Sequence, residues 1–256
     1  MLQAERYSKI YELIKEKKSV TVHFLSKQLY MSETSIRRDL EAMEQKNLIK
    51  RVWGGAMLPT VDRDIPPFVR EQTNIKAKET MAALAARFLT NSCTIFMDSS
   101  SSCLSLIPYI KEYKNIIVIT SSLRASRLLS ENTTASIILL GGQVYEGTFL
   151  TGHLAVESVK QFHTDLMFFS CSGISSHAGI TSIEPKVVEV CREMMRHTKK
   201  KILLCDSSKV GKETLLSLAD LSVPDYVIME CMPNDKELVH ELGNRLLTPT
   251  NNIGNS

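Results

Sequence analysis

Apolar residues recur every three or four positions in three short stretches near the amino-terminal end, 7–14, 22–29 and 36–43. An α-helix turns by about 100° per residue, so this spacing collects the apolar side chains of each stretch on one face. Three short helices with apolar inner faces can enclose a small core. The pattern therefore predicts a three-helix bundle in this part of the chain.

The third predicted helix has a marked beginning and a polar outer face. Ser32 has the side chain of a good N-cap, and Met31 before it can pack onto Ile36 as a hydrophobic staple. The polar residues on the outward face and its flanks are Thr34, Ser35, Arg37, Arg38 and Glu41. Hydroxyl groups and arginines near a helix N-terminus suit the DNA major groove, because arginine can bind guanine edges or phosphate. The alternative for this segment alone is an ordinary solvated amphipathic helix.

The neighbouring segments favour the DNA-binding interpretation. Residues 30–31 join the second and third helices, a connection of the length used in a helix-turn-helix. Residues 48–52 alternate apolar and basic side chains before Trp53-Gly54-Gly55-Ala56, which predicts a short two-stranded wing. Lys50 and Arg51 on that wing can reach phosphates or the minor groove. The two glycines are interpreted as a turn, since nothing around them resembles a phosphate-binding loop.

These motifs resemble the amino-terminal signature of the DeoR family of bacterial transcription regulators. The matching segments are Ser32 to Ser35, Ile36-Arg37-Arg38-Asp39-Leu40 and Arg51-Val52-Trp53-Gly54-Gly55-Ala56. Asn47 stands where glycine often ends the third helix in the family, and Trp53 stands where histidine is frequent. The resemblance implies a regulator that binds a double-stranded DNA operator. The candidate DNA-binding residues are Ser32, Thr34, Ser35, Arg37, Arg38, Lys50, Arg51 and Trp53.

The larger remainder of the chain alternates strand-like and helix-like runs. The predicted strands are 94–98, 116–120, 137–140, 166–170, 201–205 and 226–229, with helices between them, a long helix at 74–89 before them and a last helix at 235–246. Such alternation predicts a mainly parallel sheet with helices on both faces, so the fold class is α/β behind a winged helix-turn-helix. We expect domains at 1–58 and 74–247, a linker at 59–73 and a polar tail at 248–256.

Two loops after predicted strands carry candidate ligand-binding groups. Ligands of open α/β sheets bind beyond the carboxyl ends of the strands. Asp98 is followed there by serines 99–102 entering a helix, where an anion is favoured, although a capped serine-rich turn is the alternative. The later strand ends in Asp206-Ser207-Ser208-Lys209, which offers a carboxylate for sugar hydroxyls and a lysine for phosphate. Together the loops predict a site for a phosphorylated polyol.

The family resemblance extends over this part of the chain as well. Arg70, Asn74 and Lys78 resemble its Arg-Asn-Lys spacing, and Asp98 to Cys103, Gly141-Gly142, Gly152, Asp165, Gly173 and Asp206-Ser207-Ser208-Lys209 match later landmarks in order. The resemblance implies an effector domain similar in fold to ribose-5-phosphate isomerase that binds a phosphorylated sugar or a related phosphorylated metabolite and alters DNA affinity. It also implies a repressor of carbohydrate-metabolism genes. The candidate effector-binding residues are Asp98, Ser99, Ser100, Ser101, Gly141, Gly142, Gly173, Asp206 and Lys209.

Two other functions are compatible with parts of this sequence. One is a sugar-phosphate isomerase with an accessory DNA-binding domain, but isomerisation needs a placed carboxylate base. The stretch 170–175, which matches an acidic strand end of the isomerases, contains no carboxylate. Glu184 and Lys186 could mimic a catalytic pair, although a helix start explains Glu184 equally well. We therefore expect no enzyme and assign no catalytic residue. The second is a DNA-binding protein whose partner domain binds no ligand.

Charge and cysteine usage complete the picture. Residues 1–59 hold 11 Lys and Arg against 7 Asp and Glu, whereas the remainder holds 20 against 21. Positive charge is thus concentrated where DNA binding is predicted. The six cysteines form no CxxC pair and the six histidines are scattered, so we expect no metal, cofactor or disulfide. No apolar run approaches the roughly 18 residues of a membrane span. We expect a soluble, cytoplasmic homo-oligomer, a dimer or tetramer, that contacts no membrane.

Overall fold

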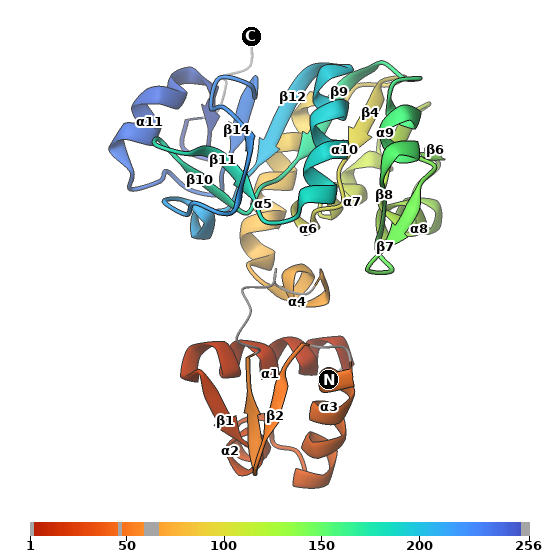
Figure 1. Cartoon of the computed structure of the whole chain (residues 1–256). Helices are drawn as coiled ribbons and strands as arrows, with labels where there is room; N and C mark the ends of the chain where they lie inside the picture. The colour runs from red at the N-terminus through yellow and green to blue at the C-terminus, as the bar shows by residue number, and fades with distance from the viewer. Residues whose placement is uncertain (1–2, 46–47, 59–66, 252–256) are drawn as a thin grey trace. The chain divides into compact units, whose positions relative to one another are not determined.

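The structure, a computed structural model, describes residues 3–45, 48–58 and 67–251. It divides into two compact units, Met1–Thr73 and Asn74–Ser256 (Figure 1). The elements of the first unit are α1 (Gln3–Lys17), β1 (Ser19–Thr21), α2 (Val22–Leu29), α3 (Glu33–Gln45), β2 (Lys50–Val52), β3 (Gly55–Met57) and α4 (Pro67–Gln72). The three predicted helices and the two-stranded wing are therefore confirmed.

The wing contains a third strand that the sequence pattern did not predict. Strand β1 pairs antiparallel with β3, which also pairs with β2, so the sheet order is β1-β3-β2. A Cβ atom on Gly55 would lie 2.0 Å from the carbonyl oxygen of Val20, so only glycine permits this close approach. Gly54, at φ 75°, makes the turn between β2 and β3. The glycine pair is therefore a turn and a close packing point, in agreement with the sequence interpretation.

Residues 67–72 differ from the linker predicted over 59–73. They form α4, which packs against α1, and the buried side chain of Val69 joins the core of the first unit. Three apolar or proline residues in a six-residue helix give too little periodicity to identify from sequence. The amino-terminal fold thus extends to Thr73. Residues 59–66 of the expected linker and Asn47 lie outside the described residues.

The second unit is built on a seven-stranded sheet of order β15-β14-β12-β9-β4-β5-β6, and every pairing in it is parallel. Its strands are β4 (Thr94–Met97), β5 (Ile117–Thr120), β6 (Ser136–Leu139), β9 (Thr164–Phe169), β12 (Thr198–Leu204), β14 (Tyr226–Ile228) and β15 (Leu246–Leu247). The mainly parallel α/β fold class is confirmed. Six of these strands match the predicted runs to within a few residues.

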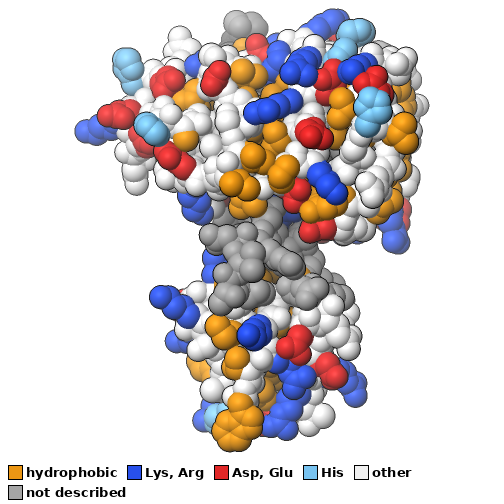
Figure 2. Space-filling view, in the orientation of Figure 1, with side chains coloured by type: hydrophobic (Ala, Val, Ile, Leu, Met, Phe, Trp, Pro, Cys, Tyr) orange, Lys and Arg blue, Asp and Glu red, His pale blue; other side chains and the backbone are white. Residues whose placement is uncertain are grey.

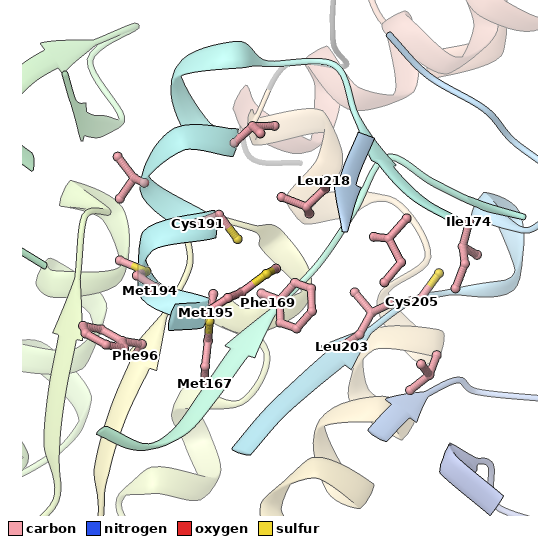
Figure 3. Packing of buried hydrophobic residues seen from close by; sticks show 14 of the residues in the cluster. Phe96, Met167, Phe169, Ile174, Cys191, Met194, Met195, Leu203, Cys205 and Leu218 are labelled. Carbon is pink, nitrogen blue, oxygen red and sulfur yellow. The ribbon is translucent and has the colours of Figure 1, made fainter. Parts of the chain in front are cut away.

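Helices cover both faces of this sheet (Figure 1). They are α5 (Ile75–Ala85), α6 (Ser101–Leu104), α7 (Ile107–Ile110), α8 (Leu123–Asn132), α9 (His153–Val159), α10 (Pro185–Arg196) and α11 (Lys236–Leu242). Alternate residues of the central strands enter two separate clusters: Phe168 packs with α5 to α8, and Met167 and Phe169 pack with α9 to α11. Figure 3 shows Met194 and Met195 of α10 in the second cluster.

Short antiparallel strands form two further sheets, separate from the parallel one, and were not predicted. β7 (Gln143–Tyr145) and β8 (Phe149–Thr151) form a hairpin, and β10 (Gly173–Ser175), β11 (Gly179–Ser182) and β13 (Leu216–Ala219) form a small sheet. Runs of three or four residues carry too little alternation to distinguish a strand from a loop.

The carboxyl-terminal end is more ordered than the expected tail 248–256. Helix α11 ends at Leu242, so the predicted helix over 235–246 is too long, and residues 246–247 form β15 instead. Thr248 is buried, and its backbone N–H donates to Asn251 Oδ1 at 2.7 Å. Residues 248–251 therefore belong to the folded unit. Residues 252–256 lie outside the described part. Within the described chain, no helix combines the length and apolarity that crossing a membrane requires.

Candidate functional sites

The third helix presents the polar face that its sequence predicts. The backbone N–H of Ser35 donates to Ser32 Oγ at 3.2 Å, which confirms Ser32 as the N-cap. Ile36 is buried in the core, whereas Thr34 and Arg38 are exposed. The hydroxyl groups of Ser32 and Ser35 are 2.9 Å apart at the exposed start of the helix.

The two arginines of this helix have different surroundings. Arg37 Nη2 pairs with Glu33 Oε2 at 2.9 Å on the solvent side of the helix. Arg38 has no hydrogen bond or ion pair with any residue in the described ranges. An arginine without an internal partner keeps all five N–H donors available for a partner molecule. Figure 2 shows other Lys and Arg side chains exposed on the same unit.

The wing offers a second exposed surface. Lys50, Arg51 and Trp53 are all exposed, and Trp53 is completely so. The backbone N–H of Arg51 donates to Glu44 Oε1 at 2.9 Å, which ties the wing to α3. This hydrogen bond fixes β2 and its exposed side chains beside α3. The fully exposed indole of Trp53 is free to contact a partner molecule.

Asp39 is a structurally important residue that the sequence interpretation passed over. Arg6 of α1 donates from Nε and Nη2 to the two carboxylate oxygens of Asp39, both at 2.9 Å. Hydrogen bonding to Asp39 raises the pKa of Arg6. The signal was present in the sequence, because Asp39 falls on the inner face of the helix, beside Ile36 and Met43. A charge at such a position needs an ionic partner.

The first candidate effector loop is organised around Asp98. Its Oδ1 accepts from the backbone N–H and the hydroxyl of Ser100 at 2.8 and 2.6 Å, and its Oδ2 accepts from the backbone N–H of Ser170 at 2.8 Å. The carboxylate therefore connects the ends of β4 and β9. Ser100 is also the N-cap of α6, while Ser99 and Ser101 are half-buried beside it.

The second loop reaches the first through Ser170. Lys209 Nζ donates to Ser170 Oγ at 2.8 Å and lies 3.6 Å from Asp206 Oδ2. Asn74 Nδ2 donates to Asp206 Oδ1 at 3.0 Å. Strands β4, β9 and β12 are neighbours, so Asp98, Asp206 and Lys209 meet at one edge of the sheet. We refer to Asn74, Asp98, Ser170, Asp206 and Lys209 as the carboxyl-edge cluster.

The cluster holds its charges in a buried setting. Burial acts to raise the pKa of Asp206, but Lys209, Ser208, Asn74 and Lys78 together lower that pKa below its ordinary value. Burial acts to lower the pKa of Lys209, and neighbouring thiols and carboxylates, Asp206 among them, raise that pKa overall. Both groups are therefore charged at neutral pH, and the cluster carries an ammonium group beside two carboxylates.

The sequence interpretation named Asn74 and Lys78 only through the family resemblance, and Ser170 only in the stretch compared with the isomerases. Asn74 begins α5 with φ 53°, a left-handed conformation that asparagine tolerates, and contributes its amide to the cluster. Lys78, one turn later, is buried. Asparagine and lysine at the start of a long helix were the available signals. Ser170 gave no comparable signal, because its role depends on neighbouring strands.

The three candidate glycines lie outside the cluster. Gly141 and Gly142 follow β6, which β5 separates from β4. A Cβ on Gly142 would meet the carbonyl oxygen of Thr151 at 2.8 Å, and one on Gly173 would meet that of Lys212 at 2.2 Å. Both glycines are explained by close backbone packing. In the part of the chain that the structure describes, no side-chain hydrogen bond joins these glycines to the carboxyl-edge cluster.

A hollow in the sensor unit is lined by residues outside this cluster. It measures about 640 Å³ and is lined by Ser176, Lys236, Glu237, His240 and Glu241. This hollow lies at α11 and the β10–β11 turn and not at the carboxyl ends of the central strands, so the carboxyl-edge cluster remains the candidate that strand topology favours. Among the described residues, no group of three or more His, Cys, Asp or Glu side chains is placed to hold a metal ion.

Comparison with known families identifies both units. Residues 6–61 match the DeoR-like helix-turn-helix domain, and residues 73–230 match the DeoR C terminal sensor domain. The chain belongs to the DeoR family. It is thus a DNA-binding transcriptional regulator with a sensor domain, as the sequence resemblance implied.

Relatives with assigned names cover nearly the whole chain. The HTH-type transcriptional regulator GolR of Listeria innocua is 34% identical over 90% of this chain and 91% of its own length. The HTH-type transcriptional repressor GlcR of Bacillus subtilis is 31% identical over 91% of both chains. The glycerol-3-phosphate regulon repressor of Escherichia coli is 27% identical over 91% of this chain and 93% of its own. A ribose-5-phosphate isomerase in complex with phospho-erythronic acid aligns at a TM-score of 0.41 and 15% identity, covering 53% of this chain and 54% of the isomerase.

Proposed function

We propose that this DeoR-family regulator represses carbohydrate-metabolism genes and that a phosphorylated sugar controls its hold on operator DNA. The observation that carries the proposal is the carboxyl-edge cluster, in which a half-buried lysine and two buried carboxyl groups converge on three neighbouring strands. The names of relatives from Bacillus subtilis and Escherichia coli, a transcriptional repressor and a glycerol-3-phosphate regulon repressor, support it.

In this proposal the third helix reads bases and the wing holds the backbone. Arg38, which has no ion-pair partner among described residues, contacts a base edge in the major groove. Lys50 and Arg51 neutralise phosphates beside it. The remaining contacts come from Ser32, Thr34, Ser35, Arg37 and Trp53. Since the partner is the DNA of the cell, the proposal places the regulator in the cytoplasm.

The effector binds at the carboxyl-edge cluster. Lys209 exchanges its hydrogen bond with Ser170 for one with the ligand phosphate, and Asp98 and Asp206 accept from sugar hydroxyls. Serines 99–101 contribute further donors beside Asp98. A ligand that occupies these groups must reorganise contacts that join β4, β9 and β12, and this reorganisation is the proposed signal.

Coupling to DNA needs more than one copy of the chain. A single small winged unit makes few base contacts, so we propose a homo-oligomer, a dimer or tetramer, that presents at least two units to spaced half-sites. If the ligand favours an arrangement that no longer matches the operator, affinity falls. A hundredfold loss requires only about 2.7 kcal/mol of coupling.

Two measurements test the proposal. Isothermal titration of the full chain with glycerol 3-phosphate, ribose 5-phosphate and similar compounds should detect binding that Lys209→Ala removes and Lys212→Ala, an exposed neighbour on the chain, retains. Gel shifts against genomic fragments should show a preferred fragment whose binding the same compound changes. Binding of no phosphorylated sugar would remove the sensor assignment, and absence of any preferred fragment would remove the operator assignment.

We also propose that the protein is not an enzyme. Glu184 accepts from the backbone N–H of Lys186 as an N-cap at 3.4 Å and from the hydroxyl of Tyr145 at 3.3 Å. Lys186 Nζ lies 4.3 Å from the centre of the Tyr145 ring. These structural contacts support a capping role for the pair. Sustained turnover of ribose 5-phosphate, lost on Glu184→Gln, would favour the isomerase alternative instead.

A further inference from the structure

Cys171 and Cys205 lie opposite each other at the ends of two neighbouring strands. The pairing of β9 with β12 places Phe169 beside Leu203, and each cysteine follows two residues later. Their Sγ atoms are 3.7 Å apart. Neighbouring strands are separated by about 4.8 Å, which falls within the Cα separation of about 4.4 to 6.8 Å that a disulfide spans. The backbone therefore permits a disulfide between them.

The two thiols differ in their access to solvent. Cys205 is completely buried and belongs to the cluster that packs under α10, where Figure 3 shows it near Leu203. Cys171 is half-buried and borders that cluster. Four of the six cysteines are buried, whereas Cys171 is half-buried and Cys231 is exposed. A small oxidant can thus reach Cys171 before Cys205.

Their surroundings divide the pair into a reactive and a resolving thiol. The hydrogen-bonding contact with Cys205 lowers the pKa of Cys171, and the ammonium group of Lys209 lowers it further against the effect of burial. The contact with Cys171 and burial raise the pKa of Cys205 well above its ordinary value. A thiolate, and not a thiol, attacks an oxidant. Cys171 is therefore the side chain that reacts first.

We propose that Cys171 and Cys205 are an oxidisable pair that hydrogen peroxide converts into an intrachain disulfide, so that the sensor domain responds to oxidants. The Cys171 thiolate attacks one peroxide oxygen, the O–O bond breaks, and hydroxide is the leaving group. Cys171 is then a sulfenic acid. The Cys205 sulfur then attacks Cys171 Sγ, the S–O bond breaks, and water leaves with the Cys205 proton. Two thiols lose two electrons and two protons, and the peroxide becomes two waters. Such disulfides in the cytosol are transient and redox-sensing.

The disulfide acts on the residues that hold Lys209. Ser170, which accepts the lysine hydrogen bond, precedes Cys171, and Asp206, its carboxylate neighbour, follows Cys205. Bond formation draws the sulfur atoms from 3.7 Å to about 2.05 Å. Oxidation therefore shifts the chain next to Ser170 and Asp206, the two residues that contact Lys209. The chemistry of the pair stands whether or not the proposed effector binds there.

Peptide mapping tests the disulfide directly. The full-length chain carrying Cys231→Ser, which removes the exposed thiol, is treated with hydrogen peroxide, alkylated after denaturation and digested. Before alkylation, we expect the mass of the chain to fall by two hydrogens. After digestion, we expect a peptide pair that links Cys171 to Cys205. Dithiothreitol should reverse both changes fully. Adding Cys171→Ser or Cys205→Ser should abolish the link, and adding Cys93→Ser, a buried cysteine in the other cluster, should leave it. Two free thiols after oxidation, or Cys171 overoxidised beside a free Cys205, would overturn the proposal.

A second measurement tests whether Lys209 activates the Cys171 thiol. In the Cys231→Ser chain the rate at which iodoacetamide alkylates Cys171 is followed against pH. Lys209→Met should slow this reaction measurably at neutral pH, because loss of the ammonium group raises the thiol pKa and lowers the fraction of thiolate. Lys212→Met should leave the rate unchanged. Equal rates in all three chains would refute the role of Lys209 in activating the thiol.

Discussion

The two units use charged side chains in opposite ways. In the amino-terminal unit Arg38, Lys50 and Arg51 point to solvent, and none of them has a side-chain ion pair within the described residues. In the sensor unit Asp206 and Lys209 are turned inward and bound to each other and to their neighbours. The first arrangement suits a large polyanion that brings its own charge. The second suits a small ligand that must exchange with existing contacts.

Outward and inward charges should respond differently to removal, and the changes in binding and in the free energy of unfolding can be measured. Outward charges are hydrated, so removing them should weaken binding and leave folding unchanged. Inward charges depend on their partners, so removing one leaves another buried and unpaired. The amino-terminal unit contains one exception, the ion pair of Arg6 with Asp39. The predictions below test whether the comparison holds, beginning with the largest effect.

Replacing Asp206 should have the largest effect on stability. Asp206→Ala removes the buried carboxylate beside the half-buried ammonium group of Lys209 and the acceptor of Asn74, so we expect the free energy of unfolding to fall by about 3 kcal/mol. Hydrogen exchange under increasing urea measures this loss within the sensor unit. Asp220→Ala, at an exposed carboxylate of the same unit, serves as the control. An equal effect of the two changes would mean that the inward charges are not structurally special.

Asp39→Ala should destabilise the amino-terminal unit by about 2 kcal/mol. Arg6 then loses both of its carboxylate contacts, but its side chain is 22% exposed and water can replace part of them. Hydrogen exchange of α1 and α3 reports the loss. Glu33→Gln weakens only exposed contacts, those of Glu33 with Arg37 and with His23, and should cost no more than about 0.5 kcal/mol. A reversed order of the two variants would contradict the inward role of Asp39.

Arg38→Ala and Lys50→Ala should separate base reading from phosphate binding. Arg38→Ala should lower the preference for operator over random DNA by about 1–3 kcal/mol, because a base contact is lost. Lys50→Ala should weaken both DNAs alike and reduce the salt slope by about one. Gel shifts over a salt series measure both quantities, and urea denaturation should show unchanged stability. Identical losses on the two DNAs for Arg38→Ala would argue against base reading.

The smallest expected effect concerns pH. Asp165 accepts from the backbone N–H and hydroxyl of Thr94 and from Lys199 Nζ, and the bond from Lys199 leads in lowering its pKa to about 2. A lowered folded-state pKa gives stability that is present above the unfolded value of about 3.9 and is lost as pH falls towards 2. The side chain is 41% exposed, so the contribution should stay below about 1 kcal/mol. Urea midpoints between pH 5 and pH 2 should fall less steeply in Asp165→Asn.

Local signals made the DNA-binding unit accessible from sequence. Ser32 marked the start of α3, and helical spacing separated Ile36 from Arg38 without any information from distant residues. The missing pieces were short or depended on tertiary contacts: β1 has three residues and exists because it pairs with β3. Helix α4 has six residues and is held by burial of Val69 against α1.

The candidate effector site was only partly accessible. Asp98, Asp206 and Lys209 could be named because each follows a recognisable strand. Ser170 could not, since its hydroxyl matters only through Lys209, which is 39 residues away along the chain. The glycines were named by family position, and the close approach of Gly142 to Thr151 and of Gly173 to Lys212 also requires glycine at those two positions.

The sequence by itself determined the periodic elements, the caps and the outward charges, because these depend on residues three or four positions apart. Tertiary structure alone decided which strand ends became neighbours. Strand order brought Asp98, Ser170 and Asp206 to one edge and set Cys171 against Cys205, and no local pattern records that order. A contact between distant segments follows from how the whole sheet buries its two faces.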